Sequence, residues 1–275
     1  QAARHYAWDM SDDSTRLAHE AVDFLSSRFG LGRIDLALVL GSGWSAGADQ
    51  LGERLGEIEL GDVPGFSPPV VSGHGGVLRL IRTMPGKTVA VLTGRTHYYE
   101  GRGVAPVVHG VRTAAAWGAA TLVLTNGCGS LNPAWGPGTV VLIRDHINLT
   151  GATPLQGASF VDMTDAYSQR LRDLAHTVRP ELPEGVYVQF RGPQYETPAE
   201  VRMAGIIGGD LVGMSTTLET IAAREAGMEV LGLSLVTNAA AGLSASGLDH
   251  SEVLRAGRDA GPGLASLLAG IAGAL

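Results

Sequence analysis

The stretch IDLALVLGSG, residues 34–43, decides the fold class of this chain. Six of its first seven residues are apolar, and a Gly-Ser-Gly turn follows them directly. A short apolar run bounded by glycine is typical of a β-strand that is buried on both faces, as strands are in parallel sheets. We therefore expect this strand to lie inside a sheet, with ligands bound beyond its carboxyl end.

Further apolar runs alternate with helical patterns along the chain. Strands are predicted at residues 77–81, 88–92, 121–125, 140–143, 186–190 and 230–237, and a short one ends near Val212. Helices are predicted from Ser11 to Gly30 and over residues 104–115, 167–178, 216–226 and 251–275. The Gly-Pro-Gly sequence at residues 261–263 is expected to interrupt the last helix. This alternation favours an α/β fold.

The organisation of the chain predicts one domain. No repeat, charge run or linker divides it, so residues 1–275 are expected to form a single α/β domain with a central mixed β-sheet flanked by helices on both faces. Residues 62–76 form a loop rich in Gly, Pro and Ser. Such loops are often mobile and functional, and we expect this one to cover a site.

Composition and charge exclude several classes of protein. Apolar residues make up 45% of the 275 residues and charged residues 17%, which is a globular balance. A net charge of -7 argues against a nucleic-acid partner. No stretch approaches about 18 uninterrupted apolar residues, so we expect no membrane span. The single cysteine, Cys128, cannot form an intrachain disulfide and indicates a cytoplasmic protein.

The turn at residues 41–43 is the first candidate ligand loop. Its glycines let a ligand approach the backbone, while amide N–H groups and the Ser42 hydroxyl can face an anion such as phosphate. Gly41, Gly43 and Ala46 also satisfy the G-x-G-x-x-A dinucleotide pattern, but glycines recur through residues 47–56, where that pattern needs a firm helix. A plain tight turn is the third interpretation.

The loop GRTHYYEG, residues 94–101, follows another predicted strand and carries two cations. Arg95 offers a planar fork of donors to phosphate oxygens, and His97 can donate one or two hydrogen bonds. Taken alone, an arginine here is as consistent with a salt bridge, and a single histidine with a structural role. Two such loops in one chain favour an anion site.

The stretch TNGCGS, residues 125–130, is a further candidate for an anion-binding nest after a strand. Cys128 lies within it. A nucleophilic cysteine needs an adjacent base, which the sequence does not identify, so we interpret Cys128 as a small packing residue.

The loop GPQYETP, residues 192–198, places an aromatic ring beside a carboxylate. Tyr195 can stack on a purine, and Glu196 can accept hydrogen bonds from ring N–H and amino groups. The same stretch reads as a helix start, with Thr197 as the cap, Pro198 at the first position and Glu200 at the third. The two interpretations are compatible.

Two later positions complete the candidate site. Ser215 precedes a predicted helix, where it would cap the helix and present its hydroxyl to an anion. Asn238 ends the last predicted strand. An amide both donates and accepts, so Asn238 suits a 6-oxopurine that develops negative charge as it leaves.

In chain order, these loops resemble those of the trimeric purine nucleoside phosphorylases. The motifs that carry the resemblance are GSG, GRTHYYEG, TNGCGSLNP, LIRDHINLTG, GPQYETPAEVR, GMST and TNAAAG. They extend from about residue 34 to about residue 254, and RDHINL and GPQYETPAE are the most specific. The resemblance implies the nucleoside phosphorylase fold, a homotrimer, and inorganic phosphate as a co-substrate with no cofactor or metal.

The resemblance also implies residue roles. The phosphate-binding positions are Ser42, His74, Arg95, His97, Gly127 and Ser215. The base-binding positions are Tyr195, Glu196 and Asn238, and the ribose-binding positions are Tyr99, Met214 and His250. Catalysis falls on Asn238, Glu196 and His97, and Phe160 corresponds to a phenylalanine that the family donates to the neighbouring subunit. Gly127-Cys128 replaces the usual Ala-Ala, and Ala239 stands where mammalian members often carry Lys.

The implied activity is the phosphorolysis of purine ribonucleosides and deoxyribonucleosides, such as inosine and guanosine, to free base and the pentose 1-phosphate. Phosphate attacks C1′ of an oxocarbenium-like ribose while Asn238 and Glu196 stabilise the departing purine. One alternative is a methylthioadenosine phosphorylase, against which Glu196 and Asn238 argue. That branch typically has an Asp as the base-side acceptor, and His250 would be out of place beside its apolar 5′ group. Another is a nucleoside-binding protein without catalysis, which would not need a phosphate pocket.

Overall fold

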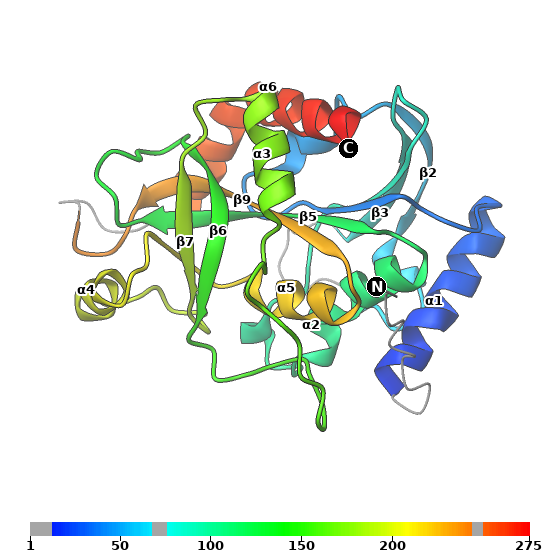
Figure 1. Cartoon of the computed structure of the whole chain (residues 1–275), viewed down its shortest axis with the longest axis horizontal. Coiled ribbons are helices and arrows are strands. Elements are labelled where there is room, and N and C mark those ends of the chain that lie inside the picture. The colour runs from blue at the N-terminus through cyan, green and yellow to red at the C-terminus, as the bar shows by residue number, and fades with distance from the viewer. Residues whose placement is uncertain (1–12, 68–75, 244–249) are drawn as a thin grey trace.

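The computed structural model describes residues 13–67, 76–243 and 250–275, and for residues 250–254 the backbone alone. Its centre is a nine-stranded mixed sheet with the order β2-β3-β4-β1-β5-β8-β7-β6-β9 (Figure 1). The strands are β1 Leu36–Val39, β2 Glu53–Glu59, β3 Val77–Arg82, β4 Thr88–Leu92, β5 Thr121–Ser130, β6 Val140–Asn148, β7 Glu184–Gln189, β8 Leu211–Gly213 and β9 Glu229–Ala239. Because β9 also pairs with β5, five strands close into a ring from which β1 to β4 extend as an open arm.

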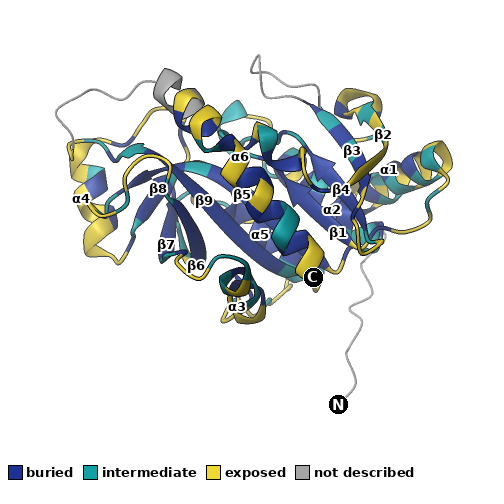
Figure 2. Ribbon diagram, turned by 90° about the horizontal axis from the view of Figure 1, so that it is seen from above, coloured by how far each residue is buried: buried dark blue, intermediate teal, exposed yellow. Residues whose placement is uncertain are grey.

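Helices cover both faces of the sheet, as expected. They are α1 Asp13–Phe29, α2 Ala105–Ala116, α3 Gln169–Val178, α4 Pro198–Ile206, α5 Thr217–Glu225 and α6 His250–Ala274. In Figure 1, α1, α2 and α5 lie on one side of the sheet and α3 and α6 on the other. In Figure 2 the central strands are buried between helices whose outer surfaces are exposed, whereas the edge strand β2 is largely exposed. No helix in the described part of the chain is long and apolar enough to cross a membrane.

Strand β1 shows how the sequence produces this layering. Ala37 and Val39 pack into the core under α1, α2 and α5, whereas Leu36 and Leu38 pack into the core under α3 and α6. Alternate side chains of a strand point to opposite faces, so an all-apolar strand is required where both faces are covered. The predicted buried strand is therefore confirmed.

Four parallel strands bring the candidate loops to one edge. β1 pairs in parallel with β4 and β5, and β5 pairs in parallel with β9. Their carboxyl ends consequently lie together, and the loops that follow β1 and β4 converge there with the ends of β5 and β9. This arrangement positions the site.

The structure corrects three predictions about elements. β5 continues to Ser130, five residues beyond the predicted end, because it pairs with β9 along its whole length. The charged edge strand β2 was not predicted, since most of its residues are exposed. Helix α6 is continuous through Pro262, where an interruption was expected. Beyond Pro262, buried Leu264, Leu267, Leu268 and Ile271 pack it against the sheet.

The predicted loop at residues 62–76 is described only in part. The 3₁₀ helix η2, Leu60–Asp62, leads into it, and residues 68–75, with the candidate His74, lie outside the described residues. His109 of α2 holds the described part, because its Nε2 lies 2.9 Å from the carbonyl oxygen of Pro64.

Candidate active site

A cavity of about 350 Å³ lies at the convergent edge of the sheet. Ten of the predicted site residues line it: Ser42, Arg95, His97, Tyr99, Gly127, Tyr195, Glu196, Met214, Ser215 and Asn238. The side chain of His250 is not described, although the residue begins α6. Phe160 is 90% exposed and does not line the cavity of its own chain.

Close backbone packing shapes the Ser42 turn. A Cβ on Gly41 would lie 2.4 Å from the carbonyl oxygen of Thr125, and one on Gly257 of α6 would lie 2.4 Å from the Cα of Gly43. The Gly41 amide donates to Thr125 Oγ1 at 2.9 Å, so it does not serve a ligand as the sequence suggested. Only the short 3₁₀ helix η1, Ser45–Ala48, follows, which removes the support for a dinucleotide-binding helix. Ser42 remains the ligand-facing group.

Gly127 lies in strand β5 and not in an anion-binding loop, which corrects the predicted nest. Its neighbour Asn126 also lines the cavity and is 1% exposed. Asn126 Nδ2 donates to Thr216 Oγ1 at 2.8 Å, and Ser234 donates to Asn126 Oδ1 at 2.8 Å. Asn126 of β5 is thus hydrogen-bonded both to the start of α5 and to β9.

Arg95 is the buried cation of the site, with a side chain only 3% exposed. Its Nη1 donates to Ser215 Oγ at 2.9 Å, and its Nε lies 3.3 Å from Glu219 Oε1. Its Nη2 is buried without a hydrogen-bond partner among the described residues. Arg95 is therefore both half of a salt bridge and a donor available to an anion.

Ser215 lies in a strained turn at the start of α5. Thr216, and not Ser215 as predicted, is the N-cap residue, and it has a φ of 80°. A β-branched residue in this region is strained by about 1–3 kcal/mol and persists only where the surroundings hold it. Ser215 Oγ accepts from Arg95 and lies 3.2 Å from Thr216 Oγ1, which already accepts from Asn126. Contacts with Arg95 and Thr216 thus hold the Ser215 hydroxyl at the wall of the cavity.

His97 is held in place by contacts within its own loop. Its backbone N–H donates to Glu100 Oε1 at 2.7 Å, and its Nδ1 lies 3.6 Å from the same oxygen. The ring stacks on Tyr99, with centroids 4.7 Å apart and planes 13° apart. Burial raises the pKa of the Tyr99 phenol above its ordinary value, so Tyr99 is a neutral donor at neutral pH.

The same cavity also has a buried hydrogen-bond acceptor in its lining. Glu196 is 8% exposed, and its Oε1 is buried without a hydrogen-bond partner among the described residues. Burial raises the pKa of this carboxyl group. Tyr195 beside it is 42% exposed. The predicted helix start is also confirmed, since Glu200 N donates to Thr197 Oγ1 at 3.2 Å and Thr197 N to Glu200 Oε2 at 2.7 Å.

Asn238 lies near the end of β9 and lines the same cavity. Its Nδ2 donates to the carbonyl oxygen of Ala239 at 2.8 Å, and its Oδ1 accepts from Thr237 Oγ1 at 2.7 Å. Both contacts are to adjacent residues and hold the amide at the cavity wall. The amide keeps a second N–H for a ligand.

Cys128 also lines the cavity, but it is 3% exposed and its Sγ lies 3.5 Å from the carbonyl oxygen of Leu235. Burial raises the pKa of its thiol to about 12. The thiolate that a nucleophile requires is therefore absent at neutral pH. The interpretation of Cys128 as a packing residue is confirmed.

Comparisons with known proteins agree with this geometry. The model of the phosphorylase superfamily matches residues 35–272. A purine nucleoside phosphorylase from Cellulomonas sp is 59% identical over 268 residues, covering 96% of this chain and 95% of that protein. The chain belongs to the purine nucleoside phosphorylase family.

Solved structures of the family share the fold. A schistosome purine nucleoside phosphorylase in complex with hypoxanthine has a TM-score of 0.83 and 32% identity, covering 92% of this chain and 95% of that one. Isoform 2 from Schistosoma mansoni, in complex with cytosine and ribose-1-phosphate, has a TM-score of 0.84 and 30% identity, covering 94% and 95%. The predicted family and the single-sheet α/β fold are confirmed.

Three residues of this nucleoside phosphorylase site were not found by sequence reasoning. Asn126 and Glu219 act through contacts with residues about 90 and 120 positions away, for which the sequence holds no local signal. Gly213 allows β8 to approach β7, since a Cβ there would lie 2.2 Å from the hydroxyl of the buried Tyr187. The position of Gly213 at a strand end was the only available hint.

Proposed function

We propose that this chain cleaves purine nucleosides with inorganic phosphate, releasing the free base and the pentose 1-phosphate. The observation that carries the proposal is that one cavity is lined both by the donors Arg95 and Ser215 and by the buried acceptor Glu196. The related structures contain hypoxanthine or ribose-1-phosphate, a base product and a sugar product of this reaction class. A pentosyltransferase has to bind the phosphate and the purine nucleoside at the same time.

The proposed mechanism assigns Arg95 and Ser215 to a phosphate end of the cavity and Glu196 and Asn238 to a base end, and each end stabilises one part of the transition state. A phosphate oxygen, held by Arg95, Ser215, Ser42 and His97, forms the new bond to C1′ as the bond to the purine nitrogen breaks. The electron pair of that bond goes to the purine, where Glu196 accepts an N–H and the amide of Asn238 stabilises the developing charge. Preorganised donors and acceptors of this kind supply most of the stabilisation in a water-poor site.

Roles for the remaining predicted residues stay within this proposal. Tyr99, Met214 and His250 contact the ribose, Tyr195 lies against the base, and His74 and Gly127 complete the phosphate end. Phosphate is the only co-substrate, so chelation of metals with EDTA should leave the rate unchanged. A rate lost to EDTA and restored by a divalent cation would contradict this part.

The assembly is proposed to be a homotrimer in the cytoplasm. Phe160 supports the trimer, because a phenylalanine that is 90% exposed in one chain gains burial by contacting a neighbouring chain. Sedimentation equilibrium tests this directly. A monomer that is fully active would contradict the donation of Phe160.

The decisive experiment measures hypoxanthine released from inosine by the purified protein, with and without inorganic phosphate. Release that requires phosphate and yields ribose 1-phosphate is the expected result. Release without phosphate would indicate a hydrolase, and binding without release would indicate a nucleoside-binding protein. Methylthioadenosine serves as the control substrate, since faster cleavage of it would assign the chain to the 6-aminopurine branch.

A further inference from the structure

The ion pair between Arg95 and Glu219 is a buried contact for which the proposed mechanism has no role. The two side chains are 3% and 2% exposed, and Arg95 Nε lies 3.3 Å from Glu219 Oε1. Taking two charges out of water is costly, so a pair buried to this extent calls for a reason beyond attraction between the two groups.

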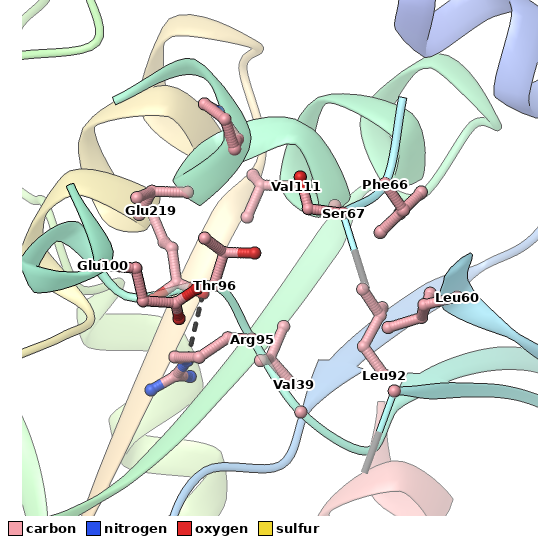
Figure 3. Close-up of a pocket in the computed structure, with 15 residues that line it drawn as sticks. Val39, Leu60, Phe66, Ser67, Leu92, Arg95, Thr96, Glu100, Val111 and Glu219 are labelled. Atoms are coloured by element: carbon pink, nitrogen blue, oxygen red, sulfur yellow. Dashed lines mark ion pairs between the residues drawn. The ribbon is translucent and has the colours of Figure 1, made fainter. Parts of the chain in front are cut away.

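Two carboxylates, Glu219 and Glu100, line a second, small cavity that Arg95 also lines. Among the described residues Arg95 forms its ion pair with Glu219, whereas Glu100 Oε1 accepts from the backbone N–H of His97. Figure 3 shows the ion pair beside this cavity of about 40 Å³, with Val39, Leu92 and Val111 among its lining residues. These apolar side chains cannot replace a carboxylate as the counter-charge. Glu219 therefore fixes the direction in which the guanidinium leaves its loop.

The second carboxylate oxygen of Glu219 holds the turn that carries Ser215. Thr216 N donates to Glu219 Oε2 at 3.0 Å, and Thr216 is the residue with the strained φ of 80°. Arg95 Nη1 in turn donates to Ser215 Oγ at 2.9 Å. The contacts form a closed ring from Glu219 through Arg95, Ser215 and Thr216 back to Glu219.

We infer that Glu219 is the positioning residue of the phosphate end, through which one carboxylate sets both Arg95 and the Ser215 turn. The inference rests on the proposed function, because it assigns Arg95 and Ser215 to phosphate. Within the ring, Arg95 Nη2 is a buried donor without a hydrogen-bond partner among the described residues, and Arg95 and Ser215 both line the cavity. Glu219 acts through these two residues and does not itself contact the substrate.

A simple charge effect of Glu219 predicts the opposite change in the affinity for phosphate. If Glu219 acted only as a negative charge near the anion, its neutralisation would strengthen phosphate binding. If it positions the donors, its neutralisation weakens phosphate binding, because the amide of Gln places an N–H against Arg95 or against the amide of Thr216. The direction of the change in phosphate affinity thus separates the two explanations.

The test compares Glu219→Gln with Glu225→Gln. Glu225 lies on the same helix and also pairs with a buried arginine, since Arg112 Nη2 is 3.3 Å from Glu225 Oε2. Arg112 does not line the 350 Å³ cavity, whereas Arg95, the partner of Glu219, does. We expect Glu219→Gln to raise the KM for phosphate at least tenfold while the KM for inosine changes less than about twofold. Glu225→Gln should leave both constants near those of the unmodified enzyme.

Two further measurements keep the inference testable. Titration of inorganic phosphate into each protein by calorimetry reports the anion site without chemistry, and should show the same loss in Glu219→Gln. Should that variant not fold, Glu219→Asp keeps the charge on a shorter side chain and should give a smaller rise in the KM for phosphate. An unchanged or lower KM for phosphate, or equal changes in both KM values, would overturn the inference. If the unmodified enzyme releases base without phosphate, the proposed function fails instead.

Discussion

Replacing Glu196 by Gln tests the base end of the cavity. The carboxylate is 8% exposed and its Oε1 has no hydrogen-bond partner among the described residues, so a 6-oxopurine N–H would supply its missing donor. A hydrogen bond to a charged group contributes about 1.5–3 kcal/mol. At about 1.4 kcal/mol per factor of ten, kcat/KM for inosine should fall roughly 10- to 150-fold.

The assay follows hypoxanthine release at saturating phosphate, with adenosine as a second substrate. Gln can donate to the unprotonated ring nitrogen of adenine, so the ratio of adenosine to inosine turnover should rise. Glu200→Gln is the matched control, because Glu200 is in the same segment but caps helix α4. A loss of less than about twofold with inosine, or an equal loss with both nucleosides, would refute the assignment of Glu196 to the base.

The pH profile gives an independent readout of the same group. Burial raises the pKa of Glu196, so its carboxylate becomes protonated at a higher pH than an exposed glutamate as the solution is acidified. Turnover of inosine should therefore fall on the acid side. Glu196→Gln should lack that acid limb, since the amide does not titrate.

Three further predictions address catalysis, stability and packing. Asn238→Ala should lower kcat about 10²- to 10³-fold in steady-state assays, because its amide acts on the departing base. The KM for phosphate should stay within about twofold of the unmodified value. Equal losses in kcat and in affinity for phosphate would contradict this role of Asn238. Burial lowers the pKa of His146 from 6.5 to about 4, so the folded state binds fewer protons and the free energy of unfolding should fall by up to about 3 kcal/mol as pH drops through this window. Urea titrations of His146→Gln should show a shallower dependence, and an unchanged one would contradict the shift. Gly213→Ala should lower the free energy of unfolding in urea by about 1–3 kcal/mol, because the added Cβ displaces the Tyr187 hydroxyl. Gly136→Ala should lower it little, since a Cβ there meets no atom within 4 Å. Equal losses in the two variants would contradict a role for the close contact between Gly213 and Tyr187.

The parts of the fold that could be predicted are the elements that a local sequence pattern indicates. An all-apolar strand such as β1 indicates burial on both faces, and the Thr197-Pro198 pair indicates a helix start. Strand β2 gave no such signal, because an exposed edge strand is stabilised by its pairing with β3 and not by its own side chains. The interruption of the last helix at Pro262 was predicted wrongly for a related reason. Tertiary packing of the apolar residues after Pro262 outweighs its unfavourable local effect on α6.

The candidate site was predicted to the extent that its residues carry chemistry in loops after strands. Arg95, Glu196 and Asn238 are recognisable because a cation, a carboxylate and an amide each follow a predicted strand, in loops whose order resembles that of the family. Asn126 and Glu219 are not recognisable in this way, since each acts on a side chain distant in sequence. Their roles follow only from the folded arrangement.

The two ends of the cavity differ in how far they are organised before a ligand arrives. At the phosphate end, Arg95 and Ser215 hold each other, and both are tied to α5. At the base end, Glu196 Oε1 is buried with no donor among the described residues, which is an unfavourable state for a carboxylate. A purine N–H relieves this state when the base binds, and the N–H of the Asn238 amide can donate to the base as it takes up the electron pair of the breaking bond. Rigid donors for the nucleophile and an unsatisfied acceptor for the leaving group therefore favour the transition state over the empty enzyme.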